Sequence, residues 1–121
     1  MPEIKNSKLY DLEERTLNFA ANIRNFLKKL PKTIANIEDS KQLARSSGST
    51  GANYIEANEA ISKKDFLLRI KISRKEAKES KFWLRLIDTN NNKTLEEERI
   101  TLIKEAEELT MIFSAIMRKS E

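Results

Sequence analysis

Apolar residues recur along this chain at the spacing of α-helices. Near the N-terminus they are separated by seven, four, three and four positions, at Leu12, Phe19, Ile23, Phe26 and Leu30. Near the C-terminus they are separated by seven, four, three, four and three positions, at Leu95, Leu102, Ala106, Leu109, Phe113 and Ile116. Such spacings place apolar side chains on one face of a helix, whereas a strand would scatter them over two faces. The pattern therefore predicts amphipathic helices.

Residues that start or end helices divide the chain into four segments. Pro31 disfavours a helical conformation at the residue before it. Ser62 and Thr94 are each followed by acidic residues within one turn, as expected of N-cap residues. Together with the polar loop at residues 88–92, these signals predict helices at about residues 10–30, 33–61, 62–87 and 94–119. The prediction is an all-α, up-down four-helix bundle that forms one domain over residues 1–121.

Residues 46–51 contain both glycines of the chain and allow two interpretations. Glycine in a helix interior costs about 1 kcal/mol relative to alanine, which favours a loop. On a helical wheel, however, Ser47, Gly48 and Gly51 lie in the middle of one face. Small side chains there would let a neighbouring backbone approach closely. From these residues alone, a loop and a continuous helix are about equally favoured.

Composition removes most common enzyme mechanisms. The 121 residues include no cysteine and no histidine, which excludes disulfides, thiol nucleophiles and imidazole bases. The carboxylates, including Glu56, Glu59 and Glu105, have no metal-ligand spacing beyond helical chance. We therefore expect a non-enzymatic protein with no cofactor and no metal. No stretch resembles a signal peptide or a membrane span, so we expect a cytoplasmic protein that does not bind membranes.

The charges are distributed unevenly between the predicted helices. The whole chain has a net charge of +4. Residues 1–32 carry a net charge of +3, residues 33–61 carry −2, residues 62–92 carry +5 and residues 93–121 carry −2. The third helix thus has the strongest positive charge, and it alternates with acidic helices on either side in the sequence.

Eight of the nine basic residues in the third helix share one third of its circumference, without an acidic residue among them. We call this group the basic face; it consists of Lys63, Lys64, Lys71, Arg74, Lys75, Lys78, Lys81 and Arg85. It extends for about 33 Å along the helix, because each residue adds about 1.5 Å. A solvated surface, a nucleic-acid-binding surface and a surface for an acidic protein or subunit are all consistent with it. The nucleic-acid hypothesis predicts a continuous exposed strip, beside which Phe82 is available to stack or pack.

The opposite side of the third helix contains charged residues within an apolar arc. Glu76 and Arg69 lie there beside Ile72 and Trp83. A buried carboxylate must be paired or neutralised. We expect a structural polar network of Glu76, Arg69 and Arg45 of the second helix. A catalytic role for Glu76 is much less favoured, because the sequence offers it no nucleophile or imidazole partner.

Three stretches resemble a bacterial four-helix-bundle family, named for proteins encoded in intervening sequences of large-subunit ribosomal RNA. The first is QLARSSGSTGANYIEA at residues 42–57. The second comprises SKKDF at 62–66 and KISRKEAKESKFWL at 71–84, and the third comprises EAEEL at 105–109 and IFSAI at 112–116. The resemblance covers most of residues 11–119. The word "ribosomal" in the family's name is inherited and implies no place in the ribosome.

This resemblance implies a second helix that continues through both glycines and a ring-like homo-oligomer, expected to be a pentamer. A related protein, the accessory variability protein of diversity-generating retroelements, is a basic pentamer that binds nucleic acid and a reverse transcriptase. Tyr54, Phe82, Trp83 and Met111 lie outside the main apolar seams, which also favours an interface. Two hypotheses follow: an oligomer that binds RNA or DNA through the basic face, and a structural or protein-interaction oligomer without a nucleic-acid role.

Overall fold

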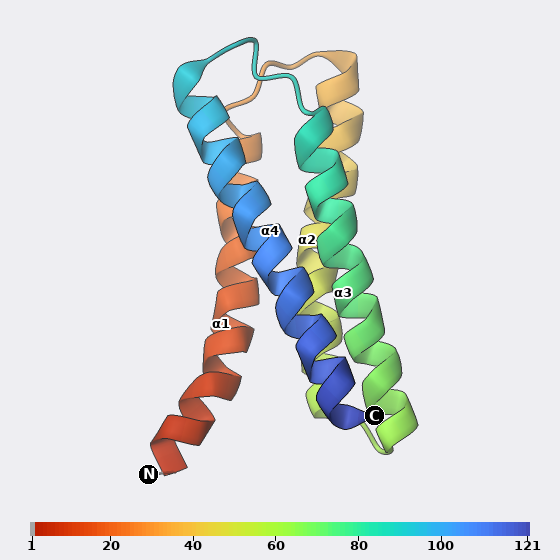
Figure 1. Ribbon diagram of the computed structural model, residues 1–121. Coiled ribbons are helices and arrows are strands. Elements are labelled where there is room, and N and C mark those ends of the chain that lie inside the picture. Colours follow the sequence, from red (N-terminus) through yellow and green to blue (C-terminus); the bar gives the residue numbers. More distant parts are fainter. Residues whose placement is uncertain (1) are drawn as a thin grey trace.

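The computed structural model describes residues 2–121, with side chains from residue 12 onward, and over this range the chain forms four α-helices and no strand. The helices are α1 (Pro2–Leu27), α2 (Ile34–Asn58), α3 (Lys63–Leu86) and α4 (Lys93–Ser120). They alternate in direction, so both ends of the chain and the α2–α3 connection lie at one end of the molecule (Figure 1). The predicted all-α class with four helices is confirmed.

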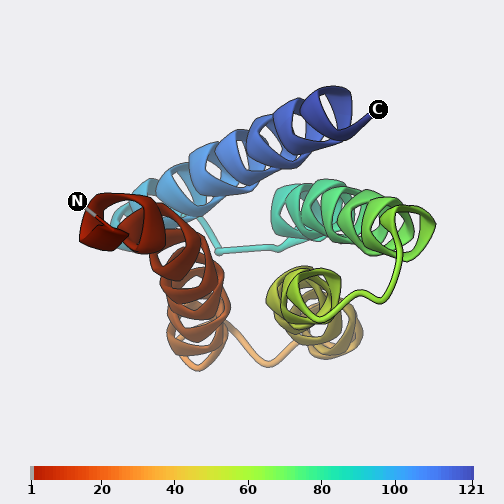
Figure 2. The same cartoon turned by 90° about the horizontal axis from the view of Figure 1, so that it is seen from below.

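Each helix packs beside its neighbours in the sequence, and α4 returns to contact α1 (Figure 2). Contact is most extensive between α2 and α3 and least extensive between α1 and α4. Toward its N-terminal end α1 leans away from the other three helices (Figure 1). The α2–α3–α4 group is therefore the more closely packed part of the molecule.

The apolar seams predicted for the first and last helices form the core. Phe19, Ile23 and Phe113 are each at most 1% exposed, and the other seam residues are buried except Ile116, which is partly buried. Tyr54 corrects an expectation, because it belongs to the core and is not available to an interface. Its side chain is 3% exposed, and its ring lies 6.0 Å from that of Phe113 on α4.

The first helix begins earlier than predicted, at Pro2 instead of near residue 10, and it ends at Leu27. Proline is tolerated in the first turn of a helix, because its missing N–H would have no helical partner there. No glycine and no second proline interrupts residues 3–9. Nothing in residues 3–9 therefore prevents the helix from starting at Pro2.

The N-cap prediction is confirmed for α3 and wrong for α4. The Ser62 hydroxyl accepts a hydrogen bond from the Asp65 N–H at 3.0 Å. At the start of α4, the side chain of Asn92 accepts the N–H of Leu95 at 3.0 Å, and Thr94 already lies within the helix. Asparagine caps helices at least as well as threonine. Asn90 and Asn91 adopt the left-handed conformation, which asparagine tolerates. The loop therefore ends at Asn92, whose side chain caps the N-terminus of α4.

The second helix continues without a break through Gly48 and Gly51. A Cβ atom added to Gly51 would lie 2.8 Å from Thr16 Oγ1 and 3.0 Å from Thr16 Cβ, both on α1. At Gly48 the nearest atom would be the flexible Arg24 guanidinium, at 3.4 Å. Gly51 therefore permits the approach of α1 to α2, which offsets its poor helix propensity, whereas Gly48 has room for a methyl group.

Alanine at position 51 is expected to destabilise the protein although alanine is the better helix former, because its Cβ would overlap buried Thr16. Gly51→Leu should lower the free energy of unfolding by about 1–3 kcal/mol or more. The control is Gly48→Ala, which should raise that free energy by up to about 1 kcal/mol. Urea unfolding followed by circular dichroism measures all three variants. Equal stability of the two alanine variants would contradict a close contact at Thr16.

Candidate nucleic-acid interface

Small side chains hold α3 against α2 and determine which face of α3 points inward. The hydroxyl oxygens of Ser46 and Ser80 are 2.8 Å apart, and Ser73 donates to the backbone oxygen of Thr50 at 2.9 Å. All four residues are fully buried. Three apolar residues complete the inward side of α3: Ile70, Ala77 and Leu84. The basic face is consequently turned away from the core.

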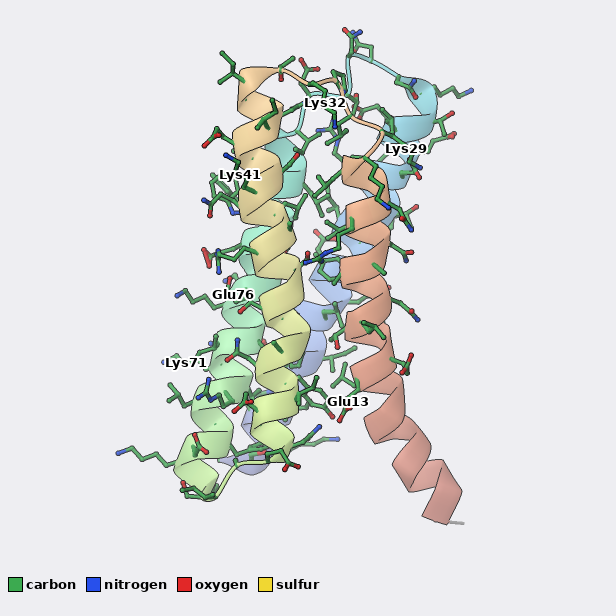
Figure 3. All side chains as sticks on the ribbon, turned by 180° about the vertical axis from the view of Figure 1, so that it is seen from behind. Glu13, Lys29, Lys32, Lys41, Lys71 and Glu76 are labelled. Atoms are coloured by element: carbon green, nitrogen blue, oxygen red, sulfur yellow. The ribbon has the colours of Figure 1, made fainter. Side chains whose placement is uncertain are left out.

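Six of the eight members of the basic face are exposed: Lys63, Lys64, Lys71, Lys75, Lys78 and Arg85. Figure 3 shows Lys71 on the outer side of α3, away from α2. Arg74 and Lys81 are partly buried, which corrects the expectation of a continuous exposed strip. Lys81 lies where α3 meets α4.

Only one member of the basic face is paired within residues 12–121. The ammonium of Lys81 lies 2.6 Å from the Glu107 carboxylate on α4. The other seven make no ion pair with a side chain in this range. Their charge is therefore compensated by solvent and counterions and not by the fold.

A groove between α3 and α4 adjoins the basic face. Its volume is about 530 Å³, and its lining combines basic, apolar and other polar residues: Lys78, Lys81, Phe82, Arg85, Glu107, Thr110 and Met111. Phe82 is 55% exposed and Met111 is 62% exposed, so both offer apolar surface to a ligand. Trp83 supports Phe82 from the same helix, with ring centroids 5.0 Å apart and planes inclined at 78°.

The contribution of α4 to this groove was not predicted from the sequence. Glu107, Thr110 and Met111 are spaced three and one apart, so they lie on one helical face. That spacing was a usable signal within α4. Their position opposite Lys81 and Phe82 depends on how α4 is rotated and shifted against α3, which no local pattern specifies.

Glu76 is buried between α3 and α2 (Figure 3), at 7% exposed, and its carboxylate accepts two hydrogen bonds from Arg45 at 3.2 and 3.3 Å. Accepting these bonds, Glu76 raises the pKa of the Arg45 guanidinium. Arg69 does not join this pair; it donates to Asn53 Oδ1 on α2 at 3.1 Å. The three residues named for a polar network therefore form two separate contacts between α2 and α3.

Two further kinds of site can be assessed over the described part of the chain. No helix within it is both long enough and apolar enough to cross a membrane. No three acidic side chains in the same range gather closely enough to hold a metal ion.

Residues 9–115 match the sequence pattern of a protein family described as "23S rRNA-intervening sequence protein". The chain belongs to this family. The match covers most of the chain, including all of α2 and α3 and most of α4. This match confirms the family that the three sequence stretches resemble.

A solved structure of similar fold comes from Bacteroides thetaiotaomicron. It is described as a protein of unknown function from the S23 ribosomal protein family, and it is 29% identical to this chain with a TM-score of 0.76. The alignment covers 92% of this chain and 98% of that one. No curated protein matches the chain. These relatives support the fold and the family, and the function has to be argued from the surface.

Replacing Glu76 by alanine is expected to lower the free energy of unfolding by about 1–3 kcal/mol, because two hydrogen bonds to Arg45 are lost inside the α2–α3 contact. Glu79→Ala is the matched control, since it removes the same charge from the same helix without breaking a described hydrogen bond. It should change stability by less than about 0.5 kcal/mol. Thermal and urea unfolding measure both variants. Equal losses would show that the loss of a negative charge near Arg45, and not the loss of the two hydrogen bonds, accounts for the effect.

Proposed function

We propose that this protein binds nucleic acid through the basic face of α3, with little sequence preference. The observation that supports this most directly is the set of seven basic side chains without an ion pair in the described range. Like charges on one helix face repel each other and destabilise the helix. A surface that keeps them unpaired is suited to an external polyanion, which removes the repulsion when it binds.

The spacing of the basic side chains fits a ligand with regularly repeated charges. Lys71, Lys75 and Lys78 follow one another at four and three residues, or about 4.5–6 Å along the helix. Lysine and arginine side chains that contact successive phosphates release condensed counterions, and this release drives binding that is independent of sequence. The affinity of such an interaction falls steeply as salt concentration rises.

Substituting Lys71, Lys75 and Lys78 by glutamate should reduce affinity for RNA and DNA at least 100-fold at low salt, because three phosphate contacts become repulsive. The folding of the bundle should be retained, since all three side chains are exposed. A matched control reverses three exposed charges outside α3, at Lys28, Lys32 and Lys104, with the same change in net charge. Fluorescence anisotropy over a salt series measures both triple variants and the unmodified protein.

Comparison of the two triple variants distinguishes binding through the basic face from attraction to the net charge of the protein. Loss of binding in the α3 variant alone supports the proposal, together with a shallower dependence of affinity on salt. Equal losses in both variants would indicate attraction to net charge and contradict a role for the basic face. An unmodified protein that retains neither RNA nor DNA at low salt would refute the proposed function.

A second candidate is a homo-oligomer whose role is structural or in protein interaction. Two apolar surfaces on opposite sides of the bundle favour it. One is the groove between α1 and α2, with Leu17 at 60% and Ile55 at 50% exposed beside Gly51. The other is the α3–α4 surface with Phe82 and Met111. Packing of one surface on the other in successive copies would form a ring, and the family resemblance implies five copies.

If the chain assembles in this way, its mass in solution should be about five times the 14.0 kDa of one chain. Ile55→Lys should lower that mass, because a charge would be buried in the α1–α2 groove. Ile34→Lys is the control, because Ile34 is 85% exposed and lies outside the groove. Multi-angle light scattering at micromolar concentration measures the masses. A mass of one chain for the unmodified protein would rule out this candidate.

A further inference from the structure

We propose that Phe82 and the groove beside it bind one unstacked base of a single-stranded nucleic acid. This inference rests on the proposed function, because the basic face must hold the phosphates that flank the base. It adds a preference for single strands over duplexes. The occupant follows from the chemistry of the groove, which combines an exposed aromatic ring with basic side chains on the same helix.

Phe82 is placed as a stacking residue would be. More than half of its side chain is exposed, although removing a phenylalanine side chain from water is energetically favourable. The contact with Trp83 holds its ring from one side, and Trp83 itself packs against the core. The ring is therefore held in position before a ligand arrives, so little side-chain entropy is lost on stacking.

The surroundings of Phe82 favour a nucleotide over a purely apolar ligand. Lys78 precedes it by about one helical turn and Arg85 follows it by nearly one turn, and both are exposed and unpaired in the described range. Glu107 is the acidic side chain that lines the groove, and Lys81 neutralises it at 2.6 Å. A phosphate that enters beside Phe82 therefore meets two free positive charges and no uncompensated carboxylate. Met111 supplies further apolar surface for the base.

Single strands are favoured because only they can present the face of a base. In a duplex the faces are stacked on neighbouring pairs, and a side chain outside the helix reaches phosphates, sugars and base edges. In a single strand a base can turn out and stack on an aromatic ring, which contributes similarly for every base. The groove, at about 530 Å³, is large enough for one base and its sugar.

The experiment compares a single strand without self-complementarity, its duplex, and an abasic strand of equal length that carries the same phosphates. Phe82→Ala should weaken binding of the single strand about 5- to 100-fold, the range expected from loss of one stacked base, and leave duplex binding within about twofold. Phe82→Trp should retain single-strand binding. Leu86→Ala is the matched control, because Leu86 is an exposed apolar residue on α3 outside the groove. RNA and DNA versions of each probe show whether the sugar contributes.

Trp83 provides a second measurement that a purely electrostatic contact would not affect. It is the single tryptophan of the chain and lies against Phe82, so its fluorescence reports on the groove. The normal single strand should quench this emission, whereas the abasic strand should leave it nearly unchanged at equal occupancy. Equal quenching by both strands would contradict stacking.

Failure of this inference differs from failure of the proposed function. Binding of neither single strands nor duplexes at low salt overturns both. Binding that Phe82→Ala does not weaken, with single strand and duplex held equally well, overturns the stacking inference and leaves the basic face as a phosphate surface. If Phe82→Ala lowers the mass of an oligomer, Phe82 is a contact between copies, and the inference is likewise overturned.

Discussion

The close contact between α2 and α3 determines what the rest of this molecule presents to its surroundings. It is made through side chains of serine and threonine size, with Ser46 against Ser80 and Ser73 against the Thr50 backbone. Small residues bring the two helices near each other, and the hydrogen bonds between them satisfy polar atoms that would otherwise be buried without partners. Because these bonds are directional, the contact fixes the rotation of α3 as well as its distance. Turning α3 about its axis would break them and bury lysines.

The same contact explains why one helix carries two opposite kinds of charged residue. Glu76, on the α2 side, has a partner in Arg45, so its charge is compensated within the fold. The basic face, on the outer side, has a single ion-pair partner among residues 12–121, which is Glu107. No acidic residue of α2 pairs with it in the described structure. Basic residues of α1 pair with acidic residues of α4, as Arg15 does with Glu105, whereas most of the positive charge of α3 stays unpaired on the surface of the described residues.

Periodicity predicts most of this architecture, and its failures have identifiable causes. The apolar seams of α1 and α4 are predictable because the burial of every apolar side chain in them lowers the free energy of the folded state, and no opposing effect has to be weighed. The glycine segment of α2 is not, because a cost of about 1 kcal/mol per glycine is opposed by a packing gain at the close helix contact of Gly51. That gain depends on Thr16, more than thirty residues away in the sequence. The α3–α4 groove is unpredictable for the same reason, since it depends on the register between two helices. The N-cap prediction was wrong for α4, where Asn92 and Thr94 lie within one turn of each other and either could cap the helix.

Neither the fold of this chain nor its family membership explains the basic face of α3. A four-helix bundle is a scaffold on which unrelated functions occur, so fold and family membership alone do not specify a ligand. The core of this bundle is stabilised by apolar seams and by the α2–α3 hydrogen bonds, neither of which needs the lysines of the basic face. Those lysines add repulsion to a helix that would be more stable with mixed charges. A chain whose only requirement was to fold would gain stability by replacing some of them. Their concentration on the outer side of α3, next to an exposed aromatic ring, is therefore not explained by the stability of the bundle itself.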